Sequence, residues 1–102
     1  MYGLIAKITA LPGKREQLIA VLVQGTAAMP GCFSYLVAQD LADKDAIWVT
    51  EVWDSLASHD ASLALPSVKE TIAQVKPMVA GFEKIAATSP VGGISSPSAG
   101  AH

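Results

Sequence analysis

A histidine and a glutamate in the middle of the chain carry the side chains best suited to proton chemistry. His59 has an imidazole, which titrates near neutral pH and can accept or hold a proton. A competing interpretation makes it a surface or capping histidine beside Asp60. Glu51 alternates with Val49 and Trp53, so we expect it on a covered face. It is either a general base or substrate-orienting acceptor, or a structural acceptor that bonds a backbone, Arg or Lys group across a subunit interface.

The aromatic residues could form the walls of a binding pocket. Flat aromatic walls suit a flat aromatic ligand, although aromatic strand residues more often pack in a core. Tyr35 could also donate a hydrogen bond to a developing oxyanion, and Ser62 lies one helical turn after His59. The candidate catalytic residues are His59, Glu51 and Tyr35, and the candidate substrate-binding residues are Trp53, Ser62, Trp48, Phe33 and Phe82.

Several common kinds of site are not supported by the sequence. The chain has two histidines, one of them at position 102, and one cysteine, so a His/Cys metal cluster is not expected. Neither a Gly-x-Gly-x-x-Gly run after a strand nor a Gly-x-Ser-x-Gly elbow occurs. The longest basic run is Lys14-Arg15 and the net charge is -2, which argues against nucleic acid or an anionic membrane as the partner.

The elements that must position these residues follow from the spacing of apolar residues and from turn residues. Pro30 should end the first helix, and Asp54 or Ser55 should cap the next one. Pro77 and Gly81 should mark the end of the last helical segment. The predicted elements are a strand at residues 2–10, a helix at 14–28, strands at 32–40 and 46–54, a short helix at 56–63, a helical segment at 68–79 and a strand at 82–88.

This order, β-α-β-β-α-β, is the ferredoxin-like arrangement of an α+β domain, in which both helices cover one face of an antiparallel sheet. The 102 residues predict a domain at 1–88 and a Gly/Ser/Pro-rich C-terminal tail at 89–102. The strand face with Trp48, Thr50 and Val52 is not solvent-like, and 51% of all residues are hydrophobic. Because exposing large apolar side chains is costly, we expect a second copy to cover that face and form a dimeric α+β barrel.

Several short motifs occur in a fixed order along most of the chain, from residue 2 to about residue 93. They are Met29-Pro30-Gly31-Cys32 with Tyr35, Glu51-Val52-Trp53-Asp54-Ser55, Ser58-His59-Asp60-Ala61-Ser62-Leu63, Leu65-Pro66-Ser67-Val68, Pro77-Met78-Val79-Ala80-Gly81-Phe82 and Pro90-Val91-Gly92-Gly93. In this order and spacing, the chain resembles the antibiotic biosynthesis monooxygenase family, and within it the quinol monooxygenases.

The resemblance implies a homodimeric barrel and, in some members, oxidation of hydroquinones or polycyclic phenols by O2 without metal, flavin or haem. Related barrels include an isomerase and haem-degrading enzymes. The chain departs from many relatives at Ser62, where they have a second histidine. The haem-degrading relatives carry a histidine on the second long helix, and residues 68–79 contain none. We therefore expect no cofactor.

Our main hypothesis is a cofactor-independent monooxygenase or oxidase of a quinol-like or phenolic compound. The aromatic ring would lie on Trp53 and Tyr35 in a pocket between sheet and helices, and His59 would accept or position the phenolic proton. The substrate anion would then reduce O2. The alternatives are a non-catalytic, stress-associated dimer that binds a small molecule in the same cavity, and an isomerase of a small metabolite.

The expected location is the cytoplasm, without a membrane partner. The only cysteine, Cys32, cannot form an intrachain disulfide, which fits a reducing compartment. The first ten residues alternate like a strand and do not form the apolar core of a signal peptide. No apolar run is long enough to predict a membrane-spanning helix.

Overall fold

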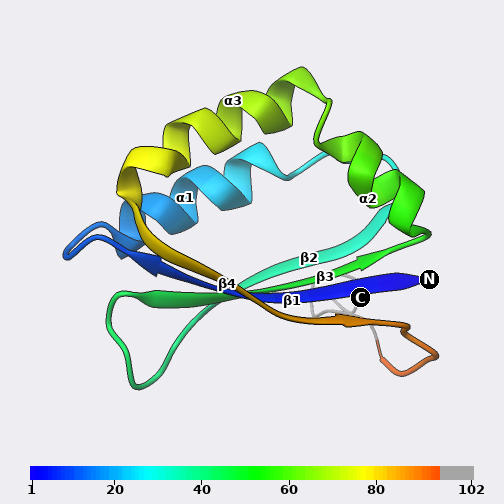
Figure 1. Cartoon of the computed structure of the whole chain (residues 1–102), viewed down its shortest axis with the longest axis horizontal. Helices are drawn as coiled ribbons and strands as arrows, with labels where there is room; N and C mark the ends of the chain where they lie inside the picture. Colours follow the sequence, from blue (N-terminus) through cyan, green and yellow to red (C-terminus); the bar gives the residue numbers. More distant parts are fainter. Residues whose placement is uncertain (95–102) are drawn as a thin grey trace.

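The computed structural model describes residues 1–94, in which helices lie over one face of a four-stranded sheet (Figure 1). The strand order is β2-β3-β1-β4, and all neighbouring strands are antiparallel. The elements are β1 (Tyr2–Ala10), α1 (Arg15–Gly25), β2 (Cys32–Gln39), β3 (Ala46–Trp53), α2 (Leu56–Ser62), α3 (Pro66–Val75), the 3-10 turn η1 (Lys76–Met78) and β4 (Val79–Thr88). The predicted α+β class and ferredoxin-like order are confirmed.

The alternation of side chains gives the sheet two different faces. We call the face beneath the helices the inner face; on β3 it carries Ile47, Val49, Glu51 and Trp53, all buried. The opposite, outer face carries Trp48, Thr50 and Val52 of β3 and Ile5 and Lys7 of β1, which are more exposed. The cross-strand register keeps each of these sets on one side of the sheet.

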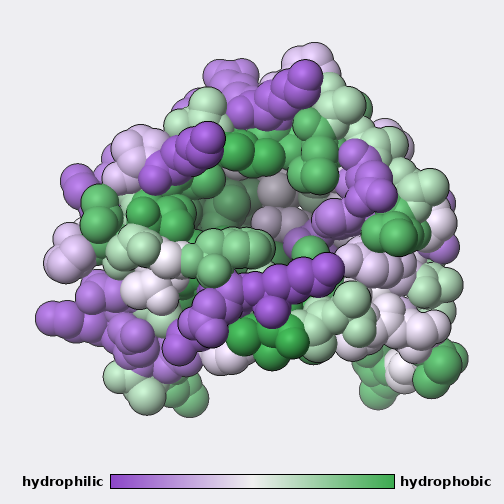
Figure 2. Space-filling model, viewed as in Figure 1, coloured by the Kyte–Doolittle hydropathy of each residue, from purple (hydrophilic) through white to green (hydrophobic). Residues whose placement is uncertain are grey.

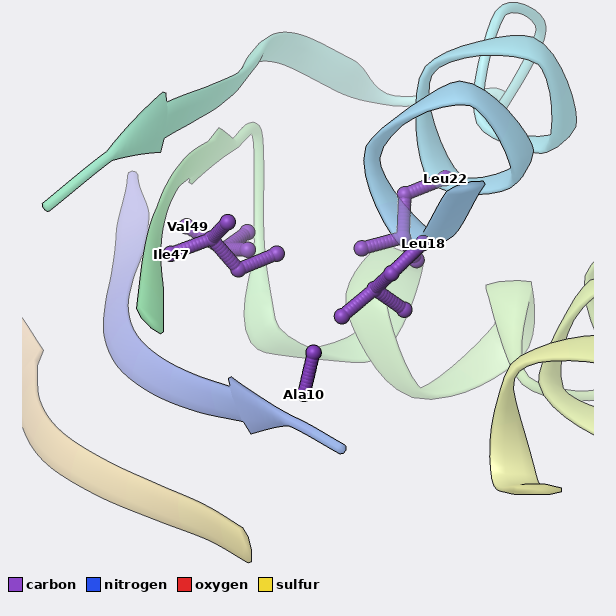
Figure 3. Close-up of a cluster of buried hydrophobic side chains, with 5 residues drawn as sticks. All are labelled: Ala10, Leu18, Leu22, Ile47 and Val49. Carbon is purple, nitrogen blue, oxygen red and sulfur yellow. The ribbon is translucent and has the colours of Figure 1, made fainter. Parts of the chain in front are cut away.

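A small apolar core joins α1 to the sheet (Figure 3). Leu18 and Leu22 lie one helical turn apart on α1 and point toward Ile47 and Val49 of β3, with Ala10 of β1 beside them. Leu18 and Ile47 have no exposed surface. Because burying each such side chain contributes about 1.5–3 kcal/mol, this cluster fixes α1 on the inner face.

Helices α1 and α3 pack closely at a glycine. A Cβ atom placed on Gly25 would collide with the side chain of Thr71, which is buried on α3. The Thr71 hydroxyl is itself held, because it donates a hydrogen bond to the Ser67 carbonyl at 2.8 Å. The absence of a side chain at Gly25 therefore sets how near the two helices approach.

Three element boundaries differ from the sequence prediction by three or more residues. The first helix ends at Gly25 and not at residue 28, because the Thr26 hydroxyl donates to the Leu22 carbonyl at 2.6 Å and the chain turns away there. The last helical segment ends before Pro77, which lies in the 3-10 turn because it has no backbone N–H to donate. Val79 consequently pairs with Ala10 as the start of β4, three residues earlier than predicted.

The segment after β4 returns across the outer face. A Cβ atom on Gly3 would contact Thr88 and lie 3.1 Å from Cγ of Pro90, so the chain crosses β1 at that glycine. Residues 89–94 are the part of the predicted tail that the structure describes, and residues 95–102 lie outside it. Over residues 1–94, no helix is both long enough and apolar enough to cross a membrane.

Candidate functional site

The inner face of the sheet carries a carboxyl group between two aromatic side chains. Glu51 lies in the middle of this face, with Leu4 of β1 and Tyr35 of β2 as its cross-strand partners. Trp53 follows on the same side of β3, and its Nε1 donates a hydrogen bond to Oε1 of Glu51 at 2.9 Å. The predicted structural role for Glu51 was a bond to a backbone, Arg or Lys group; the donor observed here is an indole.

His59 comes to the same place from helix α2. Ser55 caps this helix as predicted, because its hydroxyl accepts the backbone N–H of Ser58 at 3.1 Å. The imidazole then packs on two aromatic rings that are cross-strand partners, with its centroid 5.4 Å from Trp53 in an edge-on arrangement and 5.4 Å from Tyr2 at 51°. These two contacts restrict the movement of the imidazole.

Burial changes the proton affinity of the groups on the inner face. It raises the pKa of Glu51, although the Trp53 N–H and the nearby His59 partly oppose this shift. Burial also raises the pKa of the Tyr35 hydroxyl far above its ordinary value, and the nearby Glu51 and Cys32 add to the effect. Tyr35 therefore stays a hydrogen-bond donor at any physiological pH.

Some polar atoms of this cluster remain available for a ligand. Within residues 1–94, every fully buried side-chain nitrogen or oxygen has a hydrogen-bond partner. No bond within these residues is made by Oε2 of Glu51, Nε2 of His59 or the Tyr35 hydroxyl. Each of these three atoms must therefore reach accessible space, and Figure 2 shows the molecule hollowed between the helices and β4.

A second opening lies at the free edge of β2. A groove of about 570 Å³ there is lined by the loop after α1 and by Cys32, Phe33, Ser34 and Tyr35. Tyr35 also shares the inner face with Glu51, so this groove borders one residue of the candidate site.

The structure brings together four of the predicted site residues, His59, Glu51, Tyr35 and Trp53. Tyr2 and Cys32 also belong to this cluster, and the sequence analysis did not single them out. Tyr2 could have been found from its alternation with Leu4. Cys32 stands opposite Trp53 only because of a register shift in β2, which leaves no clear trace in the sequence.

Phe33 and Trp48 do not lie at this site. Regular alternation would put Phe33 on the inner face with Tyr35, but the register shift between Cys32 and Ser34 leaves it 62% exposed beside a groove on the outer face. Trp48 lies on the outer face, where its Nε1 donates to Asp40 at 2.7 Å. That bond is the main reason why the pKa of Asp40 falls to about 2.

Of the other two predicted residues, Ser62 lies beside His59 without a free polar group, and Phe82 lies away from the site, at the other end of β1. The Ser62 hydroxyl donates to the His59 carbonyl at 2.6 Å within α2, and the residue is 5% exposed. Phe82 pairs with Ile8 on the edge strand β4 and is 62% exposed. Within residues 1–94, no three His, Cys, Asp or Glu side chains are close enough together to hold a metal ion.

Comparison with known proteins places the chain in one family. Residues 1–74 match the sequence model of the antibiotic biosynthesis monooxygenase family. A crystal structure from Chloroflexus aurantiacus, provisionally assigned to that family by name, has 57% sequence identity and a TM-score of 0.89, covering 92% of this chain and 96% of its own. No curated protein is significantly similar to the chain.

More distant structures agree with this assignment. A Deinococcus radiodurans protein with the same provisional name has 28% identity and a TM-score of 0.74, covering 93% of this chain and 97% of its own. A Bacteroides thetaiotaomicron protein has 19% identity and a TM-score of 0.80, covering 93% and 94%, and shows the shared fold alone. The family match, the 57% identical structure and the fold together show that this chain belongs to the antibiotic biosynthesis monooxygenase family.

Proposed function

We propose that the protein is a cofactor-independent monooxygenase of a quinol-like or phenolic aromatic compound. The observation that carries this proposal is the clustering of His59, Glu51 and Tyr35 with Trp53 on the inner face. Family membership supports the monooxygenase class, and the Tyr2 ring beside the imidazole supports a flat, apolar substrate, whereas Trp53 is 1% exposed and serves to hold Glu51.

In the proposed reaction, the protein only deprotonates the substrate and stabilises the resulting charge. His59 accepts a phenolic proton, since a phenolate gives up an electron to O2 more readily than a phenol does. The protonated Tyr35 hydroxyl donates a hydrogen bond to a developing oxyanion. One oxygen atom of O2 forms a new C–O bond on the ring and the other leaves as water, so a quinol becomes a hydroxyquinone and itself supplies every electron.

We also propose that the protein works as a homodimer joined through the outer face. Phe33 and Leu36 are 62% and 44% exposed on that side of the sheet. With Met1, Val52 and Ile94 they line an apolar groove of about 600 Å³. Large apolar side chains gathered in this way favour association, and a second copy of the same face would cover both grooves symmetrically.

A second candidate function is isomerisation of a small metabolite. Glu51 has a raised pKa and lies near His59, so the two groups could take up and return a proton at different atoms of one ligand. This reaction needs no O2. Turnover of a candidate substrate under anaerobic conditions would therefore favour the isomerase.

The first experiment measures O2 uptake by the purified full chain, treated with a chelator, on a panel of reduced naphthoquinols and anthrones. Each rate is compared with autoxidation of the same compound without protein. We expect uptake above this background with at least one compound. Rates equal to background across the whole panel would exclude these phenols and leave the isomerase and the non-catalytic binding protein.

The matching variant replaces the proposed base. We expect His59→Gln to reduce kcat/KM by roughly 10²–10⁴, which is the usual contribution of a positioned general base. His102→Gln, which changes the other histidine of the sequence, serves as the control and should leave the rate unchanged. Full activity of the His59→Gln protein would remove the imidazole from the reaction.

A further inference from the structure

His59 also contacts a carboxylate, Asp60, that has no role in the reaction proposed above. Oδ1 of Asp60 lies 3.1 Å from Nδ1 of the imidazole. Asp60 is well exposed, with 64% of its side chain accessible, whereas the His59 side chain is only 17% accessible. The contact therefore joins the outer edge of the ring to a carboxylate that faces solvent.

This contact decides which ring nitrogen can act as a base. An ionised carboxylate only accepts hydrogen bonds, so Nδ1 must be the nitrogen that carries a proton. In the neutral ring, Nε2 then keeps its lone pair. Nε2 makes no hydrogen bond within residues 1–94 and reaches accessible space. An isolated histidine prefers the other arrangement, with the proton on Nε2, so the carboxylate works against the intrinsic preference of the ring.

Two aromatic rings packed against His59 help to fix the direction in which its nitrogens point. Trp53 and Tyr2 each lie 5.4 Å from the imidazole and limit how far it can swing. Trp53 is in turn held by Glu51 through the 2.9 Å bond to its Nε1. Because the imidazole plane is restricted and Nδ1 is bonded to Asp60, Nε2 is the ring nitrogen that can bind a ligand.

We propose that Asp60 is a positioning residue that keeps the proton of neutral His59 on Nδ1 and thereby leaves Nε2 as the base. Its role in catalysis rests on the proposed function, whereas the position of the proton does not. The same logic applies wherever a carboxylate orients a catalytic imidazole. Asp60 touches the histidine and need not touch the substrate.

The direct test is ¹⁵N NMR of the imidazoles in the full chain, at a pH that keeps the rings neutral. The His102→Gln protein assigns the His59 signals. We expect the proton on Nδ1 in the unmodified chain and a shift toward Nε2 in Asp60→Asn, with Asp60→Glu restoring much of the original pattern. Glu70→Gln removes an exposed acidic charge from α3 and should change nothing.

A proton found on Nε2 in the unmodified chain, or an Asp60→Asn spectrum with the same tautomer, would overturn the assignment. Activity gives a separate reading: with a substrate found by O2 uptake, Asp60→Asn should lower kcat by roughly ten- to a hundred-fold at similar KM, less than loss of the base itself. If no phenol is oxidised but the tautomer shifts as expected, the proposed function fails and the role of Asp60 stands.

Discussion

Glu51 is a carboxyl group that the fold holds 9% exposed, with an indole N–H as its hydrogen-bond donor. The charged form of such a group is destabilised, because one neutral hydrogen-bond donor replaces only part of the hydration that the carboxylate loses on burial. Its ionisation in the folded protein should therefore oppose folding. This single residue couples the stability of the chain to pH.

The sign of this coupling follows from the raised pKa. The folded chain binds the Glu51 proton more tightly than the unfolded chain, whose pKa is near 4.5. Protonated Glu51 therefore contributes its full stabilisation to the folded state below about pH 4.5. This contribution is lost as the pH rises through the higher pKa that Glu51 has in the folded protein. We expect Glu51→Gln, which keeps an acceptor for Trp53, to unfold at a higher urea concentration than the unmodified chain at pH 8, with little difference at pH 4.

Urea titrations of both proteins at the two pH values provide the check. Glu83→Gln, an exposed strand position, controls for the loss of one negative charge. An equal effect of the two substitutions at pH 8 would mean that burial of Glu51 does not weaken folding.

The candidate site could be predicted from the sequence only in part, and single residues show why. Glu51 and Trp53 could be placed together because strand alternation is a local property. Tyr35 joins them through the register of the β2–β3 pairing; the sequence predicted both strands but not this register. The prediction for Phe33 was wrong because β2 has a bulge at this point. The extra residue shifts the register, so the residues before Ser34 no longer follow the alternation of the rest of the strand. Trp48 was included for its aromatic character, although its strand position puts it on the outer face.

At the level of helices and strands, the ends were harder to predict than the interiors. The apolar spacing of β1, β3 and α1 is periodic and was read correctly. The end of α1 depends on a hydroxyl of Thr26 that turns back on its own helix, and the start of β4 depends on pairing with β1. The first is a local side-chain contact and the second is a tertiary contact, and the apolar periodicity contains neither.

The contact between α1 and α3 gives a prediction at this level. Gly25→Ala puts a methyl group into the Thr71 side chain, so the helices must separate or Thr71 must leave its bond to Ser67. Overpacking of this kind costs about 1–3 kcal/mol, which should outweigh the roughly 0.5–1 kcal/mol that alanine gains over glycine in a helix. We expect a lower Tm by differential scanning calorimetry.

Gln17→Ala, on the same helix, is the control for this substitution. The position is exposed, so the added or lost side-chain contacts are few and the Tm should stay nearly the same. A Gly25→Ala protein as stable as the unmodified chain would mean that the two helices adjust without cost.

For the whole molecule, we propose that the outer face is where two copies associate. Its apolar residues are spread over β2, β3 and the segment after β4, so no single element could cover them. Under the proposed dimer, a charge at Leu36, in the outer-face groove, would be buried without a partner, which is strongly unfavourable. The assembly should therefore respond to one substitution.

We expect Leu36→Lys to run as a monomer in size-exclusion chromatography with light scattering, at concentrations where the unmodified chain is a dimer. Val23→Lys, at a 55% exposed position on α1, is the control and should leave the dimer intact. A monomeric unmodified chain, or a Leu36→Lys dimer of equal strength, would contradict the proposed interface.

The position of β1 in the sheet has a consequence for how the chain is made. Of the four strands in this sheet, β1 is synthesised before the others, yet it lies in the middle of the sheet and receives its second neighbour, β4, only from residues 79–88. Until residues 79–88 have emerged from the ribosome, one edge of β1 has no partner and can pair with other chains. The sheet therefore cannot be completed before β4 is made, so a product truncated before residue 79 would be a substrate for chaperones and proteases.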